Sequence, residues 1–338
     1  MFFEFGAVVV VTLSWLSALA GAAAIHPRQV AVKPYKPAIA KDFPDPSIIR
    51  GEDGMYYAFG TTGGNPVVQV QVARSSSPRG PWKRLVNSTV LPYSGPAFTG
   101  LNTWAPDVQR MEDGSYVLYF SGQSAINPKH HCVGVATSAN ILGPYKPRDQ
   151  AFACDFYWGG QIDASGFRDP ANGRRYVVYK NDGNSLGRGG QCNNGIEPRE
   201  PTAIMLQEVG GNGIDKVGGP IKLLDRQGQE PLVEAPYLYR SKDGTYVLFF
   251  SSGCFTDPSY NVHYATARSV RGPFTRSPHP LLSSGDSRKL VAPGGASVMV
   301  GGDKGGDAIA FHANCDSGRC MYVKRFRFRE NIVRLLTG

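Results

Sequence analysis

The chain has 338 residues, of which 41% are hydrophobic and 19% charged, so it can bury a large core. Glycine (41 residues) and proline (25) are frequent and no long amphipathic helical pattern occurs, which argues against a helical protein and favours many short strands. The net charge of +9 comes mostly from scattered lysine and arginine residues, which argues against a nucleic-acid partner and fits attraction to anionic wall polymers.

The first 24 residues are typical of a secretory signal. An apolar run from Ala7 to Ala20 precedes small residues ending at Ala24, which predicts a signal peptide over 1–24, although Glu4 stands where basic residues are usual. The alternative is a retained membrane anchor, but the run is shorter than the roughly 20 apolar residues that a spanning helix needs. We therefore expect a secreted, extracellular protein with no membrane association. Residues 25–40 form a leader without periodicity, and one domain is expected over 41–338.

Secretion predicts that the six cysteines are oxidised. Cys315 and Cys320 flank a short turn and are expected to pair. The favoured pairings of the others are Cys132 with Cys154 and Cys192 with Cys254. None has CxxC spacing, so a zinc site is not expected. The single N-glycosylation sequon begins at Asn87 and predicts an exposed surface there.

One strand-like motif, a turn followed by an apolar run, recurs along the chain. Its copies are DGMYYAF at 53–59, DGSYVLYF at 113–120, NGRRYVVY at 172–179, DGTYVLFF at 243–250 and the degraded DAIAF at 307–311. One such sheet cannot bury both of its faces alone, whereas sheets stacked radially can. We therefore predict an all-β, five-bladed β-propeller with four-stranded antiparallel blades around a central channel. The alternative is a β-sandwich with coincidental spacing.

Acidic residues stand at a similar distance before these motifs. Asp45, Asp163 and Glu234 lie 11 to 13 residues before the aligned tyrosines, and Trp104 lies 12 before its own. In a propeller these positions fall on the innermost strand of each blade. We expect the four side chains at equivalent positions around one end of the channel. Their sequence contexts are apolar, and a charged group in such a setting needs a partner or a task.

Three carboxylates beside an aromatic ring suit glycoside hydrolysis. That reaction needs one ionised and one protonated carboxyl group, and a third can raise the pKa of the acid by like-charge repulsion. Trp104 would offer a flat face to a sugar ring. Metal-dependent hydrolysis would want histidines, and none of the six stands at these positions.

The motifs around these residues resemble glycoside hydrolase family 43, five-bladed propellers that act on arabinan and xylan. They are FPDPSII with Asp45, WAPDV with Trp104 and Asp107, QIDASGFRD with Asp163, and VEAPYLY with Glu234. The resemblance implies that Asp45 is the general base, Glu234 the general acid and Asp163 the residue that tunes the acid. It also implies inversion at the anomeric carbon, with the base and acid carboxyl groups roughly 6.5–9.5 Å apart. Trp104 and Asp107 are expected to contact substrate.

One stretch departs from the family pattern. Many members carry a histidine in a PGH stretch near a central metal ion, whereas this chain has Gly295 in that place. No cofactor is therefore expected to be required, and a channel calcium stays an open question. His312, on the fifth repeat, is a candidate to reach the channel and contact substrate, the alternative being an ordinary strand residue. The segments 181–200 and 254–260 are candidates for the walls of the site.

The leading interpretation is a secreted, monomeric, catalytic propeller that hydrolyses plant cell-wall polysaccharide. Cleavage of α-L-arabinofuranosyl linkages in arabinan or arabinoxylan is favoured over β-xylosidase activity. A non-catalytic carbohydrate-binding propeller is the second hypothesis, but it predicts loss of a carboxylate and none is missing. A retaining fructan hydrolase is the third, suggested by the Arg-Asp-Pro triplet at 168–170. We interpret Asp169 as a turn residue, because an Asn-Gly turn follows at once.

Overall fold

Each sequence repeat forms one antiparallel sheet. The computed structural model describes residues 1–2, 34–285, 288–303 and 306–336, so nearly all of the predicted signal peptide lies outside the described residues. The first four sheets, in chain order, are β2 (Ser47–Arg50), β3 (Tyr56–Gly60), β4 (Gln71–Ser75), β5 (Lys83–Arg84); β6 (Trp104–Arg110), β7 (Tyr116–Gln123), β8 (His131–Ser138), β9 (Lys146–Pro147); β10 (Gln161–Arg168), β11 (Arg175–Asn181), β12 (Ile204–Val209), β13 (Lys216–Leu224); and β14 (Val233–Arg240), β15 (Tyr246–Ser252), β16 (Asn261–Ala267), β17 (Thr275–Arg276).

The fifth sheet combines both ends of the domain. It contains β18 (Gly294–Asp303), β19 (Gly306–Cys315), β20 (Gly318–Arg329), β1 (Ile39–Asp42) and β21 (Ile332–Leu335). β1 pairs with β20, so this blade has five strands where four were predicted. β1 begins two residues inside the predicted leader because the side chain of Ile39 is buried in the core.

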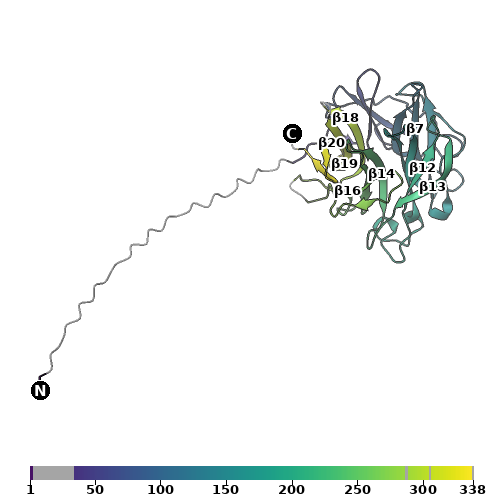
Figure 1. Cartoon of the computed structure of the whole chain (residues 1–338). Coiled ribbons are helices and arrows are strands. Elements are labelled where there is room, and N and C mark those ends of the chain that lie inside the picture. The colour runs from purple at the N-terminus through teal and green to yellow at the C-terminus, as the bar shows by residue number, and fades with distance from the viewer. Residues whose placement is uncertain (3–33, 286–287, 304–305, 337–338) are drawn as a thin grey trace. The chain divides into compact units, whose positions relative to one another are not determined.

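The first strand of every sheet lines the axis of the ring. β2, β6, β10, β14 and β18 contact one another in that order, and β18 contacts β2 again, which closes the circle. Figure 1 shows green β14 next to yellow β18 at one of these junctions. The predicted five-bladed β-propeller is therefore confirmed.

Alternating apolar side chains fill the space between neighbouring blades. One cluster joins Tyr57 and Phe59 on β3 to Leu118 and Phe120 on β7, all of them buried. Since side chains of a strand alternate between its two faces, a strand between two blades is apolar on both, as in the VLYF run of β7. The helical elements are three 3-10 turns, η1 (Phe156–Trp158), η2 (Gly183–Leu186) and η3 (Gln191–Asn193), and no helix in the described residues could cross a membrane.

All three predicted disulfides are confirmed, namely Cys132–Cys154, Cys192–Cys254 and Cys315–Cys320. The second of them joins segment 181–200 to segment 254–260. Asn87 is exposed in the turn after β5, which leaves its amide accessible to glycosylation. Asp169 is a turn residue, since its carboxylate accepts the N–H of Ala171 and its carbonyl that of Gly173.

Candidate active site

A cavity of about 560 Å³ lies at one end of the channel and contains all three predicted carboxylates. Asp45, Asp163 and Glu234 line it together with Trp104. Both segments expected to form walls contribute lining residues, which are Asn184, Ser185, Cys192 and Asn193 from the first and Phe255 and Tyr260 from the second. The central channel continues from the Asp45–Asp163 level as a hollow of only about 40 Å³ between the five inner strands. A sugar ring therefore fits in the cavity beside the carboxylates and does not fit further along the channel axis.

The inner strands share a backbone feature that places these carboxylates. Near the start of each, one residue has a positive φ, and in four strands a β-bulge lies at this point. The residues are Asp45 (52°), Ala105 (43°), Asp163 (58°), Ala235 (49°) and Gly295 (57°). Few residue types adopt this conformation readily, and aspartate is one of them.

At these bulges, the four residues predicted from the repeat do not occupy equivalent positions. Asp45 and Asp163 occupy the left-handed position itself, whereas Glu234 and Trp104 lie one residue before it. The prediction that all four are equivalent is therefore wrong. Because a bulge re-aims side chains, residues one step apart in the repeat reach the same cavity. The spacings to the aligned tyrosines do not reveal this offset, because the two left-handed aspartates lie 11 and 13 residues before theirs, while Glu234 and Trp104 both lie 12 before theirs.

The N–H group of each left-handed residue is bound by the preceding blade. In four blades the acceptor is a side chain at the inner end of the second strand. The pairs are Asp45 with His312 Nδ1 (3.1 Å), Ala105 with Thr61 Oγ1 (2.9 Å), Asp163 with Ser121 Oγ (2.9 Å) and Gly295 with Ser251 Oγ (3.0 Å). A hydroxyl or neutral imidazole can accept such a bond. These contacts lock the base of the site across the blade boundaries.

Lys180 breaks this pattern in the third blade. Lys180 pairs with Ile162 across the sheet, just as Ser251 pairs with Glu234 in the next blade. Lys180 therefore occupies the position that a hydrogen-bond acceptor occupies in the other blades. An ammonium group has no lone pair to offer. The N–H of Ala235 donates to Asp163 Oδ2 instead, at 2.9 Å. Lys180 Nζ lies 3.1 Å from Glu234 Oε2 and 3.1 Å from Asp182 Oδ1.

Glu234 accepts hydrogen bonds from two buried donors. Lys180 Nζ binds Oε2, and the hydroxyl of Tyr260 binds Oε1 at 2.7 Å. Burial alone would lower the pKa of Lys180, but Glu234, Asp182 and Asp163 outweigh that effect and raise it. The ammonium of Lys180 therefore stays charged. Glu234 has this cation beside it in space, although its neighbours in the sequence are apolar.

Asp45 is held by a cation and two hydrogen-bonding side chains. Thr61 Oγ1 donates to Oδ2 at 2.6 Å, and Arg319 Nη1 lies 3.4 Å from Oδ1. Burial alone would raise the pKa of Asp45, but the charge of Arg319 and the hydrogen bond from Thr61 hold it well below its usual range. Asp45 is therefore ionised at neutral pH, which is the state that a general base needs.

His312 supports Asp45 from behind and has no face on the cavity, where substrate contact was expected. Its side chain is fully buried, and its ring stacks on that of Tyr260 with centroids 5.9 Å apart. Burial lowers its pKa, so the imidazole is neutral and Nδ1 accepts the N–H of Asp45. A Cβ on Gly295 would lie 2.7 Å from the imidazole, so this ring fits because glycine stands there.

Asp163 has the opposite electrostatic state to Asp45. Burial raises its pKa, and the negative charge of Glu234 raises it further, to about 8, against the opposing effect of Lys180. Asp163 therefore holds a proton at neutral pH while Asp45 does not. Carboxyl groups whose environments push their pKa values apart within one cavity mark an acid–base site.

Replacing Asp163 with asparagine should raise stability at neutral pH. Because the folded pKa of about 8 exceeds the unfolded value of 3.8, folding retains a proton that the unfolded chain releases. In the wild type, the stability that the protonated Asp163 contributes is fully present below its unfolded pKa of 3.8 and is lost as the pH rises towards 8. The melting temperature of Asp163→Asn should thus exceed that of wild type by more at pH 7.5 than at pH 4.5. An equal difference at both pH values would contradict the raised pKa.

The two other predicted substrate contacts differ in their placement. Trp104 lines the cavity and stacks on His131, with centroids 3.5 Å apart and an interplanar angle of 17°. Burial lowers the pKa of His131 to about 4, so this support is uncharged. Asp107 lies instead in the narrow channel, where its buried Oδ2 accepts the N–H of Gly166 at 2.9 Å. Its contacts join two blades, and it does not line the cavity.

The residues around Asp45 do not suit a channel calcium. Calcium takes six to eight oxygen ligands, whereas the groups on Asp45 are a hydroxyl, an imidazole and the guanidinium of Arg319, and Lys180 is on Glu234. In the described part of the chain no three acidic, histidine or cysteine side chains form a candidate metal site. The protein's own cations occupy the positions next to the carboxylates, and no step of the chemistry is assigned to a metal.

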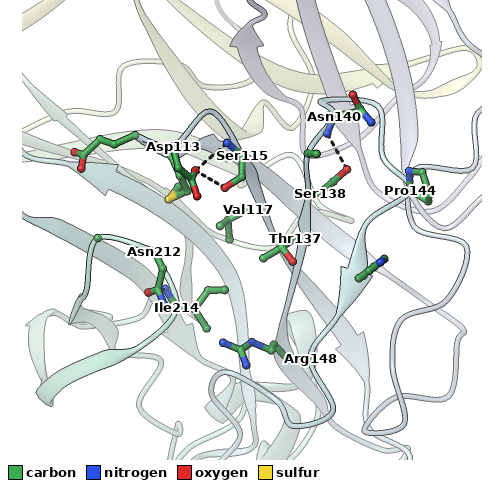
Figure 2. A pocket seen from close by; sticks show the side chains of 15 residues that line it. Asp113, Ser115, Val117, Thr137, Ser138, Asn140, Pro144, Arg148, Asn212 and Ile214 are labelled. Carbon is green, nitrogen blue, oxygen red and sulfur yellow. Dashed lines mark hydrogen bonds between the residues drawn. The ribbon is translucent and has the colours of Figure 1, made fainter.

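A larger hollow of about 840 Å³ lies elsewhere, between the turns of the second and third blades. Figure 2 shows Asp113 bonded to Ser115 on one side of it, with Asn212 and Arg148 nearby. Its lining contains none of the three carboxylates and no aromatic side chain. Size alone would select this hollow, but the acid–base groups select the smaller cavity.

An acid–base cavity at the end of a five-bladed propeller defines a glycoside-hydrolase type of site. Residues 34–332 match the family described as glycosyl hydrolases family 43. The chain belongs to this family, which confirms the resemblance, and it is a glycoside hydrolase of the arabinanase or xylosidase type.

Individual relatives agree with this assignment. The chain is 25% identical over 318 residues to a probable arabinan endo-1,5-alpha-L-arabinosidase C of Aspergillus flavus, covering 87% of this chain and 89% of the relative. It is 27% identical over 284 residues to an extracellular endo-alpha-(1->5)-L-arabinanase of Thermotoga petrophila, covering 76% of this chain and 55% of that enzyme. The endo-arabinase structure from Bacteroides thetaiotaomicron has the same fold, with a TM-score of 0.68, 21% identity and coverage of 88% and 98%.

Proposed function

We propose that this protein is a secreted, inverting hydrolase that cleaves α-L-arabinofuranosyl linkages in plant cell-wall arabinan or arabinoxylan. The observation that carries the proposal is the pair of opposite carboxyl states in one cavity, Asp45 ionised and Asp163 protonated, with Glu234 between two hydrogen-bond donors. The curated relatives named as arabinosidases and arabinanases favour arabinosyl over xylosyl linkages.

In the proposed mechanism Asp45 removes a proton from water as the water attacks the anomeric carbon. The glycosidic C–O bond breaks, and its oxygen takes the proton of Glu234. Lys180, 3.1 Å from Glu234, then stabilises the negative charge that appears on this carboxylate. Protonated Asp163 adds no negative charge to the cavity at neutral pH. A single displacement of this kind requires the Asp45 and Glu234 carboxyl groups to be roughly 6.5–9.5 Å apart, so that water fits between.

Secretion, a monomeric state and independence from cofactors are parts of the same proposal. Three disulfides and the apolar N-terminal run support an extracellular location, as does the extracellular relative from Thermotoga petrophila. The cations that act on the carboxylates are Arg319 and Lys180. Activity should therefore persist after extensive dialysis against a chelator.

A substrate panel of arabinan, arabinoxylan, xylan and levan tests the proposed function. Arabinose should be released from the first two, and proton NMR should show the inverted anomer first. Xylose from xylan alone would identify a β-xylosidase, and fructose from levan with retention would identify a fructan hydrolase. Binding without any hydrolysis would identify the non-catalytic propeller and refute the mechanism.

A further inference from the structure

Two exposed aromatic rings stand beside the active-site cavity with no role in the chemistry described above. We infer that Tyr157 and Trp158, in the turn η1, form a second sugar-binding surface, which we call the aromatic platform. It would hold residues of the polysaccharide chain that lie outside the cavity. This inference rests on the proposed carbohydrate substrate and adds a binding site for the polymer.

Both rings of the platform are accessible to a ligand. Tyr157 is 78% exposed and Trp158 is 38% exposed, with ring centroids 4.9 Å apart and an interplanar angle of 87°. The preceding residue, Phe156, packs against the core and lies beside the ring of His130. Phe156 thus anchors the turn η1 to the core. Aromatic rings that remain in water cost free energy unless a partner covers them.

The backbone under the platform is held by several contacts. The disulfide Cys132–Cys154 ties the start of the turn to β8. Asp155 then caps it, because its carboxylate accepts the N–H of Tyr157 at 3.0 Å and its carbonyl accepts that of Gly160 at 2.9 Å. Gln161 Oε1 accepts the N–H of Asp155. A preorganised surface of this kind loses little conformational entropy when it binds.

The same turn forms part of the cavity rim. The carbonyl of Gly159 accepts a hydrogen bond from Ser185 Oγ at 2.8 Å, and the N–H of Asp182 donates to the carbonyl of Gly160. Gly160 also bridges to His131, on which Trp104 stacks. Ser185, Asp182 and His131 all line the cavity. A sugar chain that leaves the cavity past Ser185 therefore meets the platform next.

A polysaccharide is the occupant that this arrangement favours. Sugar rings present flat C–H faces that stack on aromatic rings, and a tyrosine hydroxyl or indole N–H can bind sugar hydroxyl groups. Two rings form a patch far smaller than a protein interface, which buries about 800 Å² on each partner. Because the platform adjoins the cavity, one polysaccharide chain can contact both at the same time, which a single sugar cannot do.

The test compares a polymer with a small substrate for Tyr157→Ala, Trp158→Ala and the double variant. Since a good aromatic contact contributes about 0.5–1.5 kcal/mol, each single change should raise KM for soluble arabinan by roughly 2- to 13-fold. The kcat on arabinan and kcat/KM on an aryl α-L-arabinofuranoside should stay at the wild-type values. Trp158→Phe should retain most of the polymer affinity. Tyr93→Ala, which removes an exposed tyrosine outside the cavity lining, is the matched control.

Affinity electrophoresis in gels containing arabinan or xylan gives a readout that is independent of catalysis. The platform variants should migrate faster than wild type and Tyr93→Ala. If wild type hydrolyses arabinan and the double variant has an unchanged KM and migration, the platform is refuted and the proposed function stands. A parallel loss on the aryl substrate would also refute it, because the turn would then act through the cavity. If wild type neither hydrolyses nor binds these polymers, both proposals fail.

Discussion

Replacing Asp45 with asparagine should lower kcat on arabinan by about 10²- to 10⁴-fold, the usual contribution of a general base. The amide keeps the shape and can still bond Thr61, but it cannot take a proton from water. The same loss is expected for Glu234→Gln on polymer substrates. Initial rates of reducing-sugar release, measured at saturating arabinan, give the comparison directly.

Asp113→Asn is the control for these two variants, because Asp113 is an exposed carboxylate in the turn of the second blade. It should have wild-type kcat. Near-ultraviolet circular dichroism should show that all three proteins keep their tertiary packing. Full activity of Asp45→Asn on arabinan would exclude this residue as the base. A Glu234→Gln enzyme as fast as wild type would exclude the proposed acid.

Among the single substitutions of site residues considered above, Lys180→Met should lower the free energy of unfolding the most. The side chain of Lys180 is fully buried between Glu234 and Asp182, at 3.1 Å from each. Removing the cation leaves two carboxylates near each other without compensation, which typically costs about 3–5 kcal/mol of unfolding free energy. Urea denaturation at pH 7 measures this loss. The kcat should fall too, because Glu234 loses the positive charge that stabilises its ionised form.

A double-mutant cycle separates this electrostatic effect from simple loss of packing. In Lys180→Met combined with Glu234→Gln, the carboxylate that needs the cation is gone, so part of the stability should return. Lys222→Met removes an exposed lysine that is 3.9 Å from Asp225 and should change stability little. Additive losses in the cycle would show that Lys180 does not compensate the charge of Glu234.

The repeat alone was sufficient to predict the blades and the three carboxylates. Asp45, Asp163 and Glu234 lie at similar distances, 11 to 13 residues, before the aligned tyrosines, so the repeat places them at the same end of the channel. The one-residue offset of Glu234 was missed because bulges do not show in a hydrophobic pattern. Asp107 resembled a site residue only because it belongs to the same short motif as Trp104.

The partners of the carboxylates were harder to predict. Arg319 comes from another blade than Asp45, and Tyr260, although it belongs to the same blade as Glu234, lies 26 residues further along the chain, so no local pattern links them to these carboxylates. Lys180 did leave a signal. An alignment of second strands places it with Thr61, Ser121, Ser251 and His312, where a lysine stands out among acceptors. The charge of a residue is therefore most informative when it is compared with its equivalents in other repeats.

The shared edge of β20 has a consequence for the ends of the chain. β1 and β21 lie along the same edge of this strand, where Ala38 N binds Met321 O and Leu336 N binds Arg325 O. These two carbonyls are four residues apart, or about 13 Å along an extended strand. A short linker could therefore join the ends of the domain, and new termini could be opened in the exposed turn at Gly211 and Asn212. In such a circular permutant the fifth blade would be one continuous segment, and its closure would no longer wait for the first and last strands to meet.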